Sequence, residues 1–209
     1  MSYTLEDAMR DEAYDAMSRE LYPDHRDQAI EEFTSDRLRS YYLKNPDVAV
    51  NAVRMYKEAR SLLEHGHSSA CVVFAVTSIE QFLKVALLRP VVFGLIHMES
   101  LASLVVDVAM DQNGGLDRYK KLLAGLFKDL ASIDVGTIRR EGAQRPLLDE
   151  VKALQDLRNT VVHRGAQVEE ADARDALYVL KAVFSLVFVH LLSALGLQIV
   201  TGGHIIVAE

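Results

Sequence analysis

The sequence is poor in cysteine and has no recognisable export signal. Only one of its 209 residues, Cys71, is a cysteine, so no intrachain disulfide can form. A lone cysteine in an apolar run is consistent with a reducing compartment. The first residues after the methionine, Ser2-Tyr3-Thr4-Leu5-Glu6-Asp7, are acidic, whereas a secretory leader is basic and then apolar. These absences predict a cytoplasmic protein.

Positive charge is also scarce. Lysine and arginine number 23 against 30 aspartates and glutamates, which gives a formal net charge of −7 at pH 7. Nonspecific binding of nucleic acid depends on neutralising phosphates with basic residues. A broad RNA-binding face is therefore not expected, and any contact with RNA should be local.

Complete motifs for metals or nucleotide phosphates are missing as well. His65-Gly66-His67 has the residue types of a metal site, but it lies at a turn between helices and has no obvious third ligand. Asn113-Gly114-Gly115 is not followed by the lysine-serine pair of a phosphate loop. We therefore predict no metal and no cofactor.

Apolar periodicity and helix-breaking residues predict an all-α chain. Half of the residues are hydrophobic, which is ample for a substantial core. We expect Asn45 to cap the start of the helix at 46–66 and Gly165 to close the helix at 146–163. Residues 198–207 alternate weakly around Gly202-Gly203, which predicts a short hairpin or edge strand. The predicted helices are 4–21, 24–43, 46–66, 68–89, 99–110, 116–131, 146–163 and 169–195.

One predicted helix is apolar enough to raise a membrane alternative. The span from Leu177 to Val200 is long enough to cross a bilayer. Lys181 and His190 interrupt it, and acidic residues at 169–175 precede it, as the start of a solvated helix prefers. A central bundle helix is favoured over a tail anchor, so no membrane partner is predicted.

The segment Arg158-Asn159-Thr160-Val161-Val162-His163 has the clearest chemistry. Asn159 and His163 are four residues apart and share a helix face, and Arg158 lies about 100° round. Arg158 also falls within an apolar stripe. A guanidinium facing a core needs a carboxylate, carbonyls or a bound anion. Two interpretations remain open: an ion pair that joins two helices, or an anion-binding site.

Glu80 is a candidate partner for this arginine. It lies with Lys84, four residues on, inside an otherwise apolar run. The pair could form an ion pair along one buried helix. Alternatively, Glu80 meets Arg158 or His163 across the bundle and fixes the catalytic geometry.

The string from Leu157 to Gly165 resembles the signature of HEPN domains (higher eukaryotes and prokaryotes nucleotide-binding), in which arginine and histidine are separated by four to six residues. The resemblance extends to the helix that contains Ser78-Ile79-Glu80-Gln81-Phe82-Leu83-Lys84, to Pro90-Val91-Val92-Phe93-Gly94 after it, and to the long apolar helix after the motif. It covers residues 46–195. It implies an up-and-down helical bundle at 46–209, with residues 1–45 as an N-terminal helical extension.

The resemblance also implies a metal-independent endoribonuclease whose two motifs meet in a homodimer. Arg158 would bind the scissile phosphate, His163 would act as acid or base, and Asn159 would support them. Glu80, Asp156 and Thr160 are further supporting candidates. Internal attack would leave a 2′,3′-cyclic phosphate and would restrict the substrate to RNA, with transfer RNA as one candidate.

A basic loop ahead of the motif helix is a candidate substrate-binding element. The residues in question are Arg139, Arg140 and Arg145, together with Arg164 after the motif. They could form a local patch with Arg158 and gate the substrate. A solvated loop with incidental charges remains an equal alternative.

The resemblance suggests a toxin-antitoxin or anti-phage setting. Some HEPN toxins carry, two residues after the histidine, a tyrosine that a partner enzyme modifies, but Gly165 is in that position here. A cognate antitoxin would therefore have to act in another way, such as occlusion. Two alternatives remain: a non-catalytic HEPN adaptor that binds a nucleotide or a protein, and a nuclease that residues 1–45 hold inactive.

Overall fold

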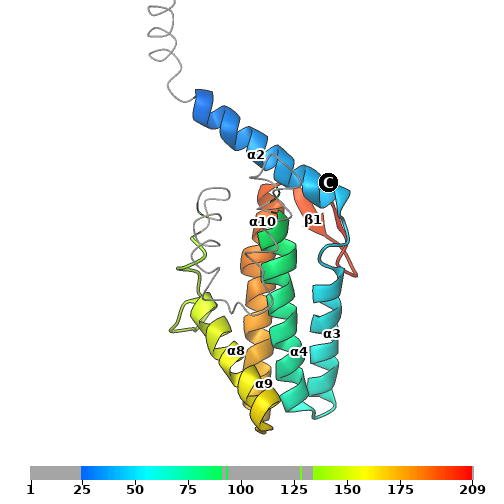
Figure 1. The fold of residues 1–209 in the computed structure, drawn as a ribbon, viewed down its shortest axis with the longest axis vertical. Coiled ribbons are helices and arrows are strands. Elements are labelled where there is room, and N and C mark those ends of the chain that lie inside the picture. The colour runs from blue at the N-terminus through cyan, green and yellow to red at the C-terminus, as the bar shows by residue number, and fades with distance from the viewer. Residues whose placement is uncertain (1–24, 91–92, 94–127, 129–133, 209) are drawn as a thin grey trace, which may run out of the picture. The chain divides into compact units, whose positions relative to one another are not determined.

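The computed structural model describes residues 25–90, 93, 128 and 134–208. In this part the chain is mostly helical and ends in a short antiparallel β-hairpin, so the coarse fold prediction is confirmed (Figure 1). The helices predicted at 4–21, 99–110 and 116–131 lie outside the described residues.

Five helices form the described part of the bundle. Helix α4 continues directly into the π-helical segment η1, and α9 runs through the π-helical segment η2 into α10. The bounds are α2 His25–Lys44, α3 Val50–Glu64, α4 Ser68–Gln81, η1 Phe82–Leu88, α8 Leu147–Arg164, α9 Glu170–Ala182, η2 Val183–Phe188 and α10 Val189–Ala194, followed by β1 Leu197–Ile199 and β2 Ile205–Val207.

Helix α8 begins and ends where local chemistry predicts. Pro146 precedes its first residue, where the lost N–H is not needed. Asp149 and Glu150 lie in the first turn, and His163 and Arg164 in the last, as the helix dipole favours. Gly165 adopts a left-handed conformation with φ 65° and stops the helix. These features confirm the predicted motif helix.

The predicted role of Asn45 is wrong. Helix α3 begins at Val50, because residues 46–49 form a turn. The Asn45 side-chain amide donates to the Tyr41 carbonyl oxygen at 2.9 Å, so it closes α2 and does not cap α3. The backbone amide of Val50 bonds instead to the carbonyl oxygen of Asp47, at 3.0 Å.

The core lies where α3, α8 and α9 pack against α4 (Figure 1). The residues Ser35–Glu209 form one compact unit. Leu38 and Tyr42 of α2 are buried in its core, and the Tyr42 hydroxyl donates to the Ala86 carbonyl oxygen at 2.6 Å. The domain boundary at residue 45 stays a prediction, although these two residues already belong to the core.

The two π-helical segments lie side by side. The ring centroid of Phe82 in η1 is 5.4 Å from that of Phe184 and 5.3 Å from that of Phe188, both in η2. A π-helical turn takes about one residue more than an α-helical turn. The continuous apolar sequence gave no sign of either segment.

One helix in the described part of the chain, Glu170–Ala194, is long and apolar enough to cross a membrane by length and composition alone. In the bundle, 50% of its most apolar 18-residue window is buried. A core helix of a bundle meets the same criterion, so the absence of a membrane partner stays a prediction.

The hairpin is fixed to the start of α3. In its antiparallel register Leu197 pairs with Val207. Gly203 in the turn has φ 99°, and a Cβ there would lie 2.9 Å from the Val50 Cα. The Ile205 amide donates to the Pro46 carbonyl oxygen at 2.9 Å. The hairpin therefore packs against α3 through a position that only glycine can occupy.

Candidate functional site

The C-terminal half of α8 positions the predicted catalytic arginine. Arg158 is half-buried, with 28% of its side chain exposed. Its Nη2 donates to Oε1 of Glu80 on α4 at 2.7 Å. The contact across the bundle that was predicted for Glu80 is therefore present, while its role in catalysis stays a prediction.

Gln155 completes this cluster and was missed in the sequence. Its Nε2 donates to the same Glu80 oxygen at 2.9 Å, and it is one of two buried polar residues in the described part of the chain. A glutamine three residues before the arginine, within the apolar stripe, was the available signal. The Glu80 oxygen thus accepts two hydrogen bonds, which hold the carboxylate in place.

The Arg158 guanidinium has unused donors. Its Nε is buried and has no hydrogen-bond partner. An unsatisfied buried donor costs free energy, about 1–3 kcal/mol. Glu80 therefore balances the charge of Arg158 without using all its N–H groups, although the buried Nε itself is closed to an anion from solvent.

Asn159 and His163 are open to solvent. Both side chains are exposed, and neither makes a hydrogen bond or ion pair within the described residues. His163 lies five residues after Arg158, about 7.5 Å further along the helix axis. The polar ends of both side chains are therefore open to a ligand or to a second subunit.

The other two supporting candidates bond locally along α8. The Thr160 hydroxyl donates to the Asp156 carbonyl oxygen at 2.9 Å, and Asp156 Oδ1 lies 3.8 Å from Lys152 Nζ. These contacts join neighbouring turns of one helix. No described contact brings Asp156 or Thr160 to Arg158.

The loop arginines lie at the other end of α8. Leu147 and Arg158 are 11 positions apart along α8, which is about 17 Å at about 1.5 Å per residue. Arg139, which donates to the Gln144 carbonyl oxygen at 3.1 Å, and Arg145 precede this span. Arg158 and Arg164 lie at its far end, so one chain does not gather all of them into one patch. Their role in substrate binding stays a prediction.

Arg140 is held by two carboxylates. Its Nε donates to Glu150 Oε1 at 3.1 Å and Oε2 at 3.0 Å, and its Nη2 donates to Asp175 Oδ1 at 2.6 Å. Hydrogen bonding to Glu150 raises the pKa of Arg140, and the charges of Asp175 and Glu150 act in the same direction. We call these three residues the Arg140 network. It joins the loop to α8 and α9.

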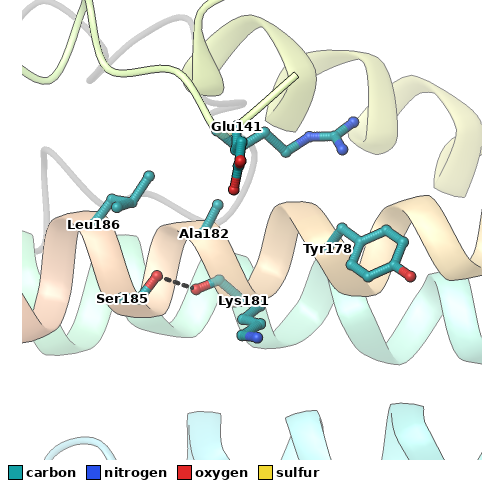
Figure 2. A pocket seen from close by; sticks show the side chains of 7 residues that line it. Glu141, Tyr178, Lys181, Ala182, Ser185 and Leu186 are labelled. Atoms are coloured by element: carbon teal, nitrogen blue, oxygen red, sulfur yellow. Dashed lines mark hydrogen bonds between the residues drawn. The ribbon is translucent and has the colours of Figure 1, made fainter. Parts of the chain in front are cut away.

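A pocket of about 440 Å³ lies beside this network. Figure 2 shows Glu141 facing a row of residues from α9 and η2. The Ser185 hydroxyl donates to the Lys181 carbonyl oxygen at 2.9 Å, and Tyr178 is exposed. The motif residues do not line this pocket. Its lining is Arg140, Glu141, Tyr178, Lys181, Ala182, Ser185 and Leu186.

Two further features bear on ligands. A pocket of about 240 Å³ lies between α3, Phe184 and the hairpin. In the described part of the chain, no three or more His, Cys, Asp or Glu side chains are placed to hold a metal ion.

Comparisons of the chain with protein-family models, with curated proteins and with solved structures find no match. A function for the chain has to be inferred from its own residues.

Proposed function

We propose that the chain is a metal-independent endoribonuclease of the HEPN type that acts as a homodimer. The observation that supports this most is the half-buried Arg158, paired with Glu80 and followed in the same helix by the exposed side chains of Asn159 and His163. An arginine with one carboxylate partner and spare donors suits a phosphate, and an exposed histidine suits proton transfer.

In the proposed reaction the ribose 2′-oxygen attacks the adjacent phosphorus, and the bond to the 5′-oxygen breaks. One His163 takes the 2′-hydroxyl proton, and the partner subunit's His163 gives a proton to the departing 5′-oxygen. Arg158 donates to the phosphate oxygens as their charge grows, and Asn159 adds a donor. The products are a 2′,3′-cyclic phosphate and a 5′-hydroxyl.

The dimer is part of the proposal because each chain contributes one motif histidine. Val162, next to His163, is 52% exposed, so this part of α8 is open to a partner subunit. The proposed setting is a cytoplasmic toxin-antitoxin or anti-phage system, with an antitoxin that occludes the site.

The test is cleavage of total transfer RNA and of a single-stranded RNA by the full chain in EDTA. His163→Ala should lower the rate about 10²- to 10⁴-fold, the usual contribution of a general acid or base. His190→Ala is the matched control, since His190 is also exposed and lies on α10. It should cleave like the wild type.

Analysis of the product ends gives a second readout. Cyclic-phosphate ends from the wild type and from His190→Ala support the proposal. Equal cleavage by His163→Ala, or activity that EDTA abolishes, contradicts it.

A non-catalytic HEPN-like adaptor is the second candidate. One observation favours it: Glu80 already balances the charge of Arg158, as in an ion pair that only joins α4 and α8. An adaptor should cleave no RNA as a folded dimer. It should also bind its protein or nucleotide partner equally well with His163→Ala, which a pull-down or titration would measure.

A further inference from the structure

The pocket between α3 and the hairpin has the chemistry of an anion site. Its volume is about 240 Å³, and we call it the hairpin pocket. Helix α3 contributes Tyr56, Lys57 and Arg60, and the turn from Thr201 to Gly203 forms another wall. Both charged residues among its described lining are cations, in a chain whose formal net charge is −7.

Both cations are available to a ligand. Lys57 is exposed and makes no ion pair within the described part of the chain. Arg60 Nη2 lies 3.6 Å from Glu64 Oε1, and more than 60% of each side chain is exposed. Such an exposed pair contributes little free energy, about 0–1 kcal/mol, so a bound anion can replace Glu64.

The hairpin turn adds neutral donors. The Val200 amide bonds to the His204 carbonyl oxygen at 2.8 Å, and the Gly203 amide to the Val200 carbonyl oxygen at 3.0 Å. These bonds fix the turn. Within the described residues, the amides of Thr201 and Gly202 donate to no protein acceptor. Successive open backbone amides in a turn favour anions.

The remaining wall is apolar and partly aromatic. Tyr56 and Val53 come from α3, and Phe184 comes from the π-helical segment η2. The ring of Phe184 contacts that of Phe82, with centroids 5.4 Å apart, which supports it from behind. π-helical turns occur frequently at functional sites. Cations and open amides thus lie next to a surface that suits a planar ring.

We propose that the hairpin pocket binds a small phosphorylated metabolite with a planar ring. Lys57, Arg60 and the turn amides contact the phosphate, and Tyr56 and Phe184 contact the ring. The volume is slightly below the about 300–1,000 Å³ of drug-sized ligand sites, which limits the ligand to the size of a mononucleotide. The pocket shares no lining residue with the motif, so this proposal does not depend on the nuclease.

The test is isothermal titration of the full chain with adenosine 5′-monophosphate as the probe. Inorganic phosphate and adenosine each supply one half of the probe. We expect each half to bind at least about tenfold more weakly than the whole, because each loses charge-assisted hydrogen bonds or ring contacts worth about 1.4 kcal/mol or more.

Substitutions locate the site. Lys57→Met and Arg60→Met should each weaken binding about tenfold. Arg54→Met is the matched control: Arg54 is exposed on the same helix, hydrogen-bonds to Asn51 and does not line the pocket. Thr201→Val keeps the backbone amide that the proposal uses, so it should bind the probe like the wild type. Circular dichroism checks that each variant folds.

Three outcomes would overturn the proposal. They are no heat of binding at millimolar probe, equal affinity for adenosine and for the probe, and unchanged affinity in Lys57→Met and Arg60→Met. His163→Ala should bind the probe like the wild type, so loss of RNA cleavage and loss of this site are told apart.

Discussion

Two half-buried arginines at opposite ends of α8 differ in how fully they are paired. Arg140 donates three hydrogen bonds to Glu150 and Asp175, with 23% of its side chain exposed. Arg158, at 28% exposed, donates to one oxygen of Glu80 and keeps a buried Nε without a partner. Within the described residues, Arg140 therefore bonds through two of its three guanidinium nitrogens and Arg158 through one.

This difference separates two roles for a buried cation. An arginine with two carboxylates joins three chain segments, and an added anion would have to displace a partner. An arginine with one carboxylate and open neighbours can accept an anion without losing its support. The comparison therefore favours Arg158 over Arg140 as a phosphate-binding residue, although the sequence offered both.

The largest expected effect is on the Arg140 network. Arg140→Met leaves the Glu150 carboxylate, only 13% exposed, without its cation. We expect a loss of about 3 kcal/mol in the free energy of unfolding, since breaking a buried pair costs about 3–5 kcal/mol. Guanidinium denaturation measures it. Arg139→Met, an exposed neighbour, should change stability by less than about 0.5 kcal/mol. Equal losses in both variants would show that the pairs of Arg140 contribute no more than an exposed arginine does.

Alkaline pH should lower the free energy of unfolding through the thiol of Cys71, whereas the Arg140 network keeps its charges. Burial raises the pKa of the Cys71 thiol to about 11 from 9.0. The unfolded chain then releases this proton before the folded chain does. The contribution of Cys71 to the free energy of unfolding should be constant below pH 9 and fall by up to about 1.4 kcal/mol per pH unit between pH 9 and pH 11. Arg140 keeps its proton over this range, as arginines do, and the hydrogen bond to Glu150 raises its pKa further.

Cys71→Ala provides the control for that slope. Denaturation at pH 8, 9 and 10 should show the slope in the wild type and a reduced one in the variant. An unchanged slope would assign the loss to other groups. Tyr42, whose pKa burial raises well above 10.0, contributes at still higher pH.

Gly165→Ala probes the motif end of α8. At φ 65° a Cβ is strained, although nothing lies within 4 Å of it. We expect a loss of about 1.5 kcal/mol, within the about 1–2 kcal/mol cost of a left-handed residue. Thermal unfolding measures it. Gly142→Ala, with φ 75° and equally open space, is the control for the strain alone and should lose a similar amount. No loss at Gly165 would show that the cap is not needed.

The smallest expected effect is on the pair at the motif end. Glu80→Gln keeps an acceptor for Arg158 and Gln155 but removes the charge, so stability should fall by about 1 kcal/mol. Glu64→Gln, in the exposed pair with Arg60, should fall by less than about 0.5 kcal/mol. Chemical denaturation compares them. A larger loss for Glu64→Gln would contradict the assigned ranking.

Much of the fold could be predicted because its signals are local. Pro146 and Gly165 bound α8 through backbone geometry, and the Gly202-Gly203 turn indicated the hairpin. Asn45 misled because its side chain can bond backwards to Tyr41 as well as forwards, and sequence spacing does not decide between the two.

The site was less predictable because its contacts join distant segments. Glu80 and Arg158 are 78 residues apart, and Arg140 and Asp175 are 35 apart. The sequence supplied Glu80 as a candidate partner but gave no sign that Arg140 would be paired with two carboxylates. Local spacing also grouped the loop arginines with Arg158, whereas the rise of an intervening helix separates them.

The two π-helical segments, η1 and η2, change how the faces of their helices follow from the sequence. Each absorbs about one residue beyond the α-helical count while the helix continues on both sides, as α9 does into α10. The apolar repeat therefore changes phase between Ala182 and Val189, and the run looks like an uninterrupted hydrophobic stretch. A wider turn needs filling, and the rings of Phe82, Phe184 and Phe188 do so. Counting 3.6 residues per turn through η2 would therefore misplace the face that α10 presents to β1.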